Sequence, residues 1–299
     1  MVFDMMLSVN NLVDLSKLTK KDFYIIFKLA KELKRKQKKG IKHKLLSGKT
    51  LAMLFEKSST RTRVSFETGM TQLGGHAIFL GKNDIQMGRG ETVADTARTL
   101  SCYVDLIMAR TFSHELVLEM ERISSVPVIN GLTDYNHPCQ ILADLFTVIE
   151  KKGKIEKLKF SFVGDGNNVC NSFINASKRL GFELVVATPK GYDPALKCNL
   201  VHDPKKAVKG ADVVITDTWV SMGDEKQKKK RVKDFKGFIV DSKLVNLAKK
   251  DFIFLHCLPA YRGHEVSADV IDGSHSLVWE EAENRMHVQK AIMVLLAQC

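Results

Sequence analysis

Hydroxyl and guanidinium groups are concentrated in the segment "SSTRTR" (58–63). The segment follows the apolar run "TLAMLFEK" (50–57) and precedes a helical pattern over 61–73. The start of a helix offers backbone N–H groups without intrahelical partners and a partial positive charge, so anions bind there readily. A helix cap flanked by two surface arginines is the alternative, but a cap uses one hydroxyl and leaves the others unexplained. The segment therefore predicts a phosphate site.

Two further features of the first half could act on a carbonyl group. "HPCQ" (137–140) opens a helix, with Pro138 suited to its first position and His137 and Gln140 three residues apart. A histidine there tends to stay neutral and can polarise a carbonyl, although a capping role is equally open. Arg110 is the last residue of the strand "VDLIMAR" (104–110). Parallel sheets bind ligands beyond this end of their strands, so Arg110 could contact a ligand. The alternative is an ordinary surface arginine.

The segment "FVGDGNNVCNS" (162–172) resembles a dinucleotide-binding turn only in part. Gly164 and Gly166 have the required spacing, but Val169 occupies the third glycine position. The following strand, "FELVVATP" (182–189), does not end in an acid that could bind a ribose. The two asparagines after the turn favour contacts to a small polar ligand instead.

Three more residues lie at the ends of predicted strands or at the start of a predicted helix. Asp217 follows the strand "ADVVITD" (211–217) and could bind a cationic amine, and Cys257 ends the strand "FIFLHCLP" (252–259). Each alone is more often structural, since a buried, inert cysteine is the commoner case. Arg285, in "ENRMH", opens the last helix, which could return it to the same site.

Length and composition place these residues in an ordinary globular protein. The chain has 299 residues, 44% apolar and 27% charged, enough for two domains with buried cores. Uninterrupted apolar runs are too short for a membrane span, and the N-terminal segment lacks the pattern of a secretory or mitochondrial address. Six irregularly spaced cysteines are typical of reduced thiols, so we expect a cytoplasmic protein.

The net charge of +12 raises nucleic acid as a partner, but its distribution argues against one. The segments 31–44 and 225–236 carry net charges of +7 and +5, so the rest of the chain is neutral. Neither segment interleaves the aromatic residues that single-strand binding would use. Both are interpreted as solvated helix faces or loops.

Strand and helix patterns alternate along the chain and predict an α/β fold. In the first half, strands at 50–57, 76–81, 104–110 and 126–131 alternate with helices, beginning with 19–39 and ending with 137–152. The alternation restarts after "EKKGKIE" (150–156), with strands at 157–165, 182–188, 211–217, 237–241 and 252–259. We therefore expect two domains, 1–150 and 151–299, each a parallel sheet flanked by helices, and a last helix near 280–299 that packs back on the first domain.

Taken together, "SSTRTR", "HPCQ", "DTWVSMG" and "HCLPAYRG" resemble the motifs of the aspartate/ornithine carbamoyltransferase family, in order and over nearly the whole chain. "HCLPA" and "SMG" resemble the ornithine branch. The resemblance implies transfer of a carbamoyl group from carbamoyl phosphate to L-ornithine, giving L-citrulline and phosphate for arginine biosynthesis. It also implies a homotrimer and a cis peptide bond between Leu258 and Pro259.

The resemblance implies the site residues position by position. Arg110, His137 and Cys257 would be catalytic. Carbamoyl phosphate contacts would be Ser59, Thr60, Arg61, Thr62, Gln86, Arg110, His137, Gln140, Cys257, Leu258 and Arg285, with Gln86 reaching the neighbouring subunit's site. Ornithine contacts would be Asn168, Asp217, Ser221 and Met222.

The implied chemistry needs neither a metal nor another cofactor, because carbamoyl phosphate is already an activated acyl donor. Rival hypotheses are a carbamoyltransferase for putrescine, acylated ornithine or aspartate, a nicotinamide dehydrogenase built on 161–188, and a basic nucleic-acid binder. We expect small-molecule substrates and neither nucleic acid nor a membrane as a partner.

Overall fold

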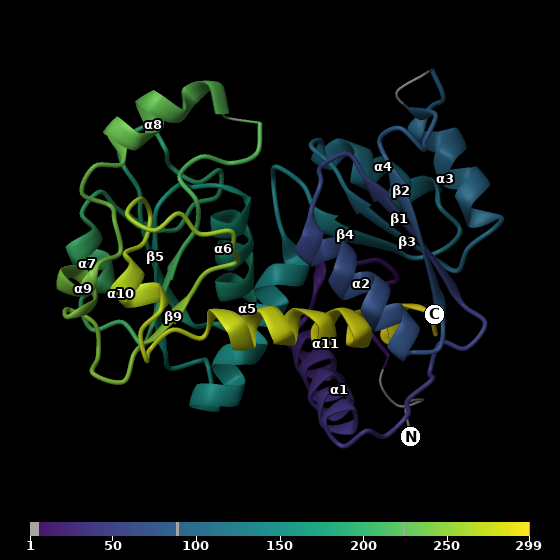
Figure 1. Ribbon diagram of the computed structural model, residues 1–299, viewed down its shortest axis with the longest axis horizontal. Coiled ribbons are helices and arrows are strands. Elements are labelled where there is room, and N and C mark those ends of the chain that lie inside the picture. Colours follow the sequence, from purple (N-terminus) through teal and green to yellow (C-terminus); the bar gives the residue numbers. More distant parts are fainter. Residues whose placement is uncertain (1–5, 88–89, 224, 299) are drawn as a thin grey trace. The chain divides into compact units, whose positions relative to one another are not determined.

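A computed structural model describes residues 6–87, 90–223 and 225–298 (Figure 1). Within them the chain forms two compact units. Unit 1 comprises residues up to Ala143 together with those from Glu283 onward, and unit 2 runs from Asp144 to Ala282. Both divisions fall inside a helix, α5 (Pro138–Lys152) and α11 (Val278–Leu296), so each of these helices contributes residues to both units.

Unit 1 contains a parallel sheet with the strand order β2-β1-β3-β4 (Figure 1). The bounds are β1 (Thr50–Phe55), β2 (His76–Gly81), β3 (Leu106–Arg110) and β4 (Val128–Leu132). The chain passes from β1 to β2 on one side and then to β3 on the other. In such sheets ligands bind beyond the carboxyl ends of the strands at this reversal, between β1 and β3.

Helices precede and follow the strands of unit 1, as the sequence predicts. They are α1 (Lys20–Lys38), α2 (Thr60–Gln72), α3 (Val93–Ser101) and α4 (His114–Ile123), with a short 3-10 turn, η1 (Leu15–Lys17). Thr19 caps α1, and Asp22 completes a capping box with it. Burial opposes ionisation of Asp22, but hydrogen bonds from Ser8 and Thr19 outweigh it and lower the pKa of that carboxyl.

The C-terminal part of α11 packs within unit 1 through buried polar contacts. Lys290 is fully buried, and its ammonium donates hydrogen bonds to Gln37 (3.1 Å), His43 (2.6 Å) and Gln72 (2.7 Å). These partners belong to α1, the loop after it and the last residue of α2. The return of the last helix to the first domain is thereby confirmed.

Unit 2 contains a second parallel sheet, with the order β7-β6-β5-β8-β9 (Figure 1). The strands are β5 (Lys159–Val163), β6 (Glu183–Ala187), β7 (Asn199–Val201), β8 (Val213–Thr216) and β9 (Ile253–Leu255). The helices are α6 (Asn168–Leu180), α7 (Pro204–Val208), α8 (Lys228–Asp234), α9 (Ser242–Val245) and α10 (Ala268–Ile271), with a 3-10 turn, η3 (Glu225–Gln227). The chain reverses direction between β5 and β8, and the predicted two-sheet α/β fold is confirmed.

One strand prediction in unit 2 is wrong, and one strand was missed. The apolar segment 237–241 forms no strand, because only Val240 makes an isolated bridge, to Val266. Gly237 has a φ of +95°, and the Phe238 N–H closes a turn onto the Phe235 carbonyl, so the segment continues the end of α8 instead of a sheet. The three-residue strand β7 carries too little pattern to be recognised in sequence.

No helix among the described residues is both long and apolar enough to span a membrane. Within the same residues five cysteines form no disulfide, namely Cys102, Cys139, Cys170, Cys198 and Cys257. Cys299 lies outside the described residues.

The burial of Lys290 predicts a distinct effect of pH on stability. Burial lowers the pKa of Lys290 from its ordinary value of 10.5 to about 8. Between these values the unfolded chain binds more protons than the folded chain, so the contribution of Lys290 to the free energy of unfolding rises with pH. From pH 8 to pH 10.5, the free energy of unfolding of the wild type should therefore rise by roughly 3 kcal/mol relative to that of Lys290→Met.

Denaturant unfolding of both proteins at several values between pH 8 and pH 10.5 measures this difference. Lys31→Met, which removes an exposed lysine of α1, serves as the control and should show no such trend. A difference between the wild type and Lys290→Met that stays constant over the range would contradict the assignment.

Candidate functional site

The hydroxyl-rich segment forms the N-terminal end of α2, as predicted. Ser59 is the N-cap residue, and its Oγ accepts a hydrogen bond from the Thr62 N–H (3.2 Å) and lies 3.0 Å from Thr62 Oγ1. Thr60 is exposed, Arg61 is half-buried and Thr62 is fully buried. The helix start therefore presents hydroxyls, backbone N–H groups and a guanidinium, which together favour an anion.

Two buried arginines converge on the hydroxyl of Thr62. Arg110, the last residue of β3, places Nη1 3.3 Å from Thr62 Oγ1, and Arg285 of α11 places Nη2 2.7 Å from it. Both side chains are among the buried charged residues of the chain. Two elements far apart in sequence, β3 and α11, thus bring positive charge to the N-terminal end of α2.

His137 and Gln140, at the start of α5, complete this cluster within unit 1. Arg285 Nη1 donates to Gln140 Oε1 (2.8 Å), and Arg285 Nη2 lies 3.4 Å from His137 Nε2. Burial, and then the charges of Arg285, Arg110 and Arg61, hold the pKa of His137 well below its usual value. The imidazole is therefore neutral at pH 7, because a second proton would add charge beside the arginines.

Gln86 lies in the loop between β2 and α3. Its side chain is exposed, and its carbonyl oxygen accepts a hydrogen bond from the Glu91 N–H (3.3 Å).

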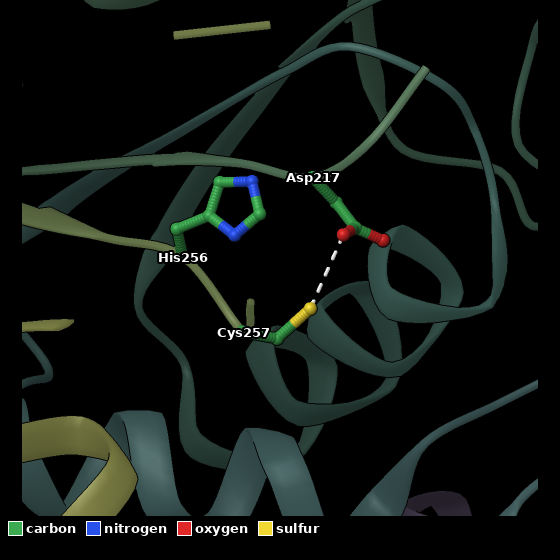
Figure 2. A group of neighbouring side chains, drawn as sticks. All are labelled: Asp217, His256 and Cys257. Carbon is green, nitrogen blue, oxygen red and sulfur yellow. Dashed lines mark hydrogen bonds between the residues drawn. The ribbon is translucent and has the colours of Figure 1, made fainter. Parts of the chain in front are cut away.

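Unit 2 holds a second cluster, beyond the ends of β8 and β9 (Figure 2). Cys257 Sγ donates to Asp217 Oδ1 (3.1 Å), and Asn167 Nδ2 donates to Asp217 Oδ2 (2.7 Å). Burial, and then the negative charge of Asp217, raise the pKa of the Cys257 thiol well above its ordinary value. The protonated thiol can donate a hydrogen bond, but it is a poor nucleophile.

Asp217, His256 and Cys257 could also be read as metal ligands, because their ligand atoms all lie within 4.8 Å of one another (Figure 2). Hydrogen bonds account for the grouping without an ion. His256 Nδ1 accepts the Leu258 N–H (2.9 Å), and the thiol proton goes to Asp217. The raised pKa of Cys257 opposes the thiolate form that binds metals.

The other predicted contacts of unit 2 surround these residues in the chain. Asn168 begins α6 directly after Asn167, and Ser221 and the exposed Met222 lie in the loop after β8. Leu258 has a left-handed φ of 57°, and its peptide bond to Pro259 is cis, which confirms the expected isomer.

The structure explains why position 166 holds a glycine without invoking a dinucleotide. A Cβ atom at this position would lie 2.3 Å from the backbone nitrogen of Pro194 and 2.6 Å from the carbonyl oxygen of Tyr192. A glycine is required because another backbone segment packs against it, which needs no bound nucleotide.

Sequence reasoning missed two residues that support the second cluster. Asn167 both caps α6 and binds Asp217, and only the pair of asparagines in the sequence hinted at it. Arg231 was assigned to a solvated basic face. Its Nη1 instead donates to Asp165 (2.6 Å) and to the Trp219 carbonyl (3.0 Å), next to the 220–223 loop. No sequence signal separated it from the neighbouring lysines.

Two successive segments of the chain match domains of one protein family. Residues 10–150 match the carbamoyl-P binding domain of aspartate/ornithine carbamoyltransferase, and residues 156–296 match its Asp/Orn binding domain.

Individual relatives extend over nearly the whole chain. A protein of Carboxydothermus hydrogenoformans named ornithine carbamoyltransferase is 54% identical, with 95% of this chain and 96% of the relative covered. The solved ornithine carbamoyltransferase of Pyrococcus furiosus is 51% identical with a TM-score of 0.92, covering 95% of this chain and 96% of that one. The anabolic ornithine carbamoyltransferase of Campylobacter jejuni is 44% identical with a TM-score of 0.91, covering 97% and 99%. The chain belongs to the aspartate/ornithine carbamoyltransferase family.

Proposed function

We propose that the protein transfers the carbamoyl group of carbamoyl phosphate to the side-chain amine of L-ornithine, giving L-citrulline and phosphate. The observation that carries the proposal is the cluster of Arg110, Arg285 and neutral His137 at the N-terminal end of α2. Two relatives, from P. furiosus and C. jejuni, are named anabolic ornithine carbamoyltransferases, which supports a role in arginine biosynthesis.

The first domain, about residues 1–150, binds carbamoyl phosphate in this proposal. The phosphate group takes the N-terminal end of α2, where Ser59, Thr60, Arg61 and Thr62 offer directed donors to its oxygens. The carbamoyl end is held by the other predicted contacts, among them Gln140, Leu258 and Arg285. The last helix, about 280–299, belongs with this domain because it supplies Arg285.

The carbonyl group of carbamoyl phosphate is activated by Thr62, Arg110 and His137. These groups donate hydrogen bonds to the carbonyl oxygen, which becomes an oxyanion when the amine attacks. Neutral His137 can donate the one proton on its ring, and Arg285 beside it opposes a second proton. The new carbon–nitrogen bond forms, the carbon–oxygen bond to phosphate breaks, and the amine proton passes to the departing phosphate.

The second domain, about residues 151–299, binds the acceptor. The carboxylate of Asp217 suits a substrate amine, and Cys257 donates a hydrogen bond beside it. Asn168, Ser221 and Met222 contact the rest of ornithine. The raised pKa of Cys257 argues for an orienting thiol and against a covalent intermediate. Asp217 would repel the extra carboxylate of an acceptor such as aspartate. A substrate panel distinguishes ornithine from putrescine and acylated ornithine.

We further propose a homotrimer in the cytoplasm, with Gln86 completing the site of a neighbouring subunit. β2 is an edge strand of its sheet, and an exposed strand edge favours contact with another chain. Ile78 on β2 and Val64 on α2 are exposed apolar residues, 39% and 53% accessible. This surface adjoins the loop that carries Gln86, so a second copy of the chain is a fitting partner.

Replacement of Arg61 by alanine should weaken carbamoyl phosphate binding without unfolding the protein. The loss of a charge-assisted contact to a partly desolvated anion should cost about 1.5–3 kcal/mol. Steady-state kinetics would show it as a raised KM for carbamoyl phosphate. Arg63→Gln is the control, because Arg63 lies two residues later, pairs with Glu67 and stacks on Phe79. Equal KM values for both variants and the wild type would remove Arg61 from the phosphate site.

Replacement of Asp217 by asparagine should impair the acceptor side selectively. The neutral amide removes the charge that attracts the amine, so the KM for ornithine should rise or turnover should fall far more than carbamoyl phosphate binding. Asp251→Asn is the control, because Asp251 is an exposed aspartate of the same unit, paired with Lys152. Parallel losses for both substrates in Asp217→Asn would indicate a structural role only.

Mixing of two inactive variants tests the shared site. Suppose that Gln86→Ala and Arg110→Ala are each nearly inactive. In a closed ring of three, random reassembly of equal amounts should restore about a quarter of all sites, where intact Arg110 meets a neighbour's intact Gln86. Sites confined to one chain would each keep one lesion, and mixing would restore nothing. A stable, active monomer in gel filtration would also contradict the proposal.

A further inference from the structure

Two buried asparagines form a side-chain bridge in unit 1, next to His137 in the chain. Asn130, in the middle of β4, is fully buried, and Asn136 is 1% exposed. Asn130 Nδ2 donates to the Val13 carbonyl (3.0 Å) and to Asn136 Oδ1. Both N–H bonds of one amide are therefore used to join β4 to the loop that precedes α5.

Asn136 also closes the turn that leads to His137. The Thr133 N–H donates to the Asn136 carbonyl (2.9 Å), and the Asn136 N–H donates to Thr133 Oγ1 (3.2 Å). The next residue is His137, and α5 begins directly after it. The last side chain of the turn, Asn136, is thus hydrogen-bonded to Asn130 of β4.

The other side of the bridge is anchored to the main chain. The Leu12 N–H donates to the Val128 carbonyl (2.9 Å), and the Asn130 N–H donates to the Leu12 carbonyl (2.8 Å). The segment beside Val13 therefore runs along β4 and fixes the acceptor that receives the first Asn130 N–H. Because β4 is a sheet strand, Asn136 is held by a rigid element.

We propose that Asn130 and Asn136 are positioning residues that set the place of the His137 imidazole during carbamoyl transfer. The inference rests on the proposed function of His137. The imidazole must stay beside Arg285, where its Nε2 lies 3.4 Å from Nη2, and still reach the carbonyl oxygen. If the bridge is lost, the turn is released, and a displacement of about 1 Å can lower turnover about 100-fold.

The same chemical change should be more damaging at Asn130 than at Asn136. Asn136→Asp keeps the Oδ1 acceptor of the bridge, and Asn136 Nδ2 makes no hydrogen bond among the described residues, so its kcat should fall less than that of Asn136→Leu, which has no acceptor. Asn130→Asp removes both donors and sets a carboxylate against two acceptor oxygens. Its kcat should fall about 100-fold, while the KM for carbamoyl phosphate changes far less, because the phosphate is held at α2.

If Asn130→Asp does not fold, Asn136→Leu serves in its place, because leucine has a similar volume and no acceptor. It should lose about as much kcat as expected for Asn130→Asp. Near wild-type kcat in Asn136→Leu would overturn the proposal, and so would an equal loss in Asn136→Asp and Asn136→Leu.

A double-variant comparison separates positioning from general damage. If Asn136 acts through His137, then His137→Gln combined with Asn136→Leu should be no slower than His137→Gln alone. Losses that multiply would mean that Asn136 supports the fold and not the imidazole. A His137→Gln variant with wild-type turnover would refute the proposed role of His137 itself. A slow His137→Gln variant together with wild-type turnover in Asn136→Leu would refute the positioning role alone.

Discussion

Buried positive charge is the constraint on which unit 1 depends. Arg110 and Arg285 both reach the hydroxyl of Thr62, and Arg285 also contacts the amide of Gln140 and lies beside His137. Guanidinium groups stay charged even when they are buried, so both arginines can attract an anionic ligand. Burial, and then the same charge, lower the pKa of the His137 imidazole and keep it neutral. Helix α11 must return to unit 1 to supply Arg285, and Lys290 and Asn284 tie it to α1.

Unit 2 uses the same architecture with the opposite charge. Its sheet also reverses chain direction beside the central strand, and polar residues again follow the strand ends. There the central group is a carboxylate, Asp217, that receives hydrogen bonds from Asn167 and Cys257. One unit therefore favours an anion, and the other can attract a cationic amine. This division suits a reaction between a phosphorylated donor and an amine acceptor.

The alternation of strands and helices was predictable because apolar runs and caps are local signals. Such signals are carried by the caps Thr19 and Ser59 and by the apolar strands before Arg110 and Asp217. The helix starts beside the cluster in unit 1 could therefore be located. Contacts that depend on tertiary structure could not be predicted. Arg231 looks like its lysine neighbours in sequence, yet it is paired with Asp165. Lys290, Asn130 and Asn136 gain their importance only from burial, and the apolar segment 237–241 is kept out of the sheet by the turn after α8.

The most direct test of the account is the identity of the product formed from carbamoyl phosphate and a panel of amines. Purified protein would be incubated with carbamoyl phosphate and either ornithine, putrescine, an acylated ornithine or aspartate, and the carbamoylated products and phosphate would be quantified by mass spectrometry and phosphate assay. Citrulline and phosphate are expected in equal amounts from ornithine, with far slower reaction of the other three acceptors. Faster carbamoylation of another acceptor, or no citrulline at all, would contradict it.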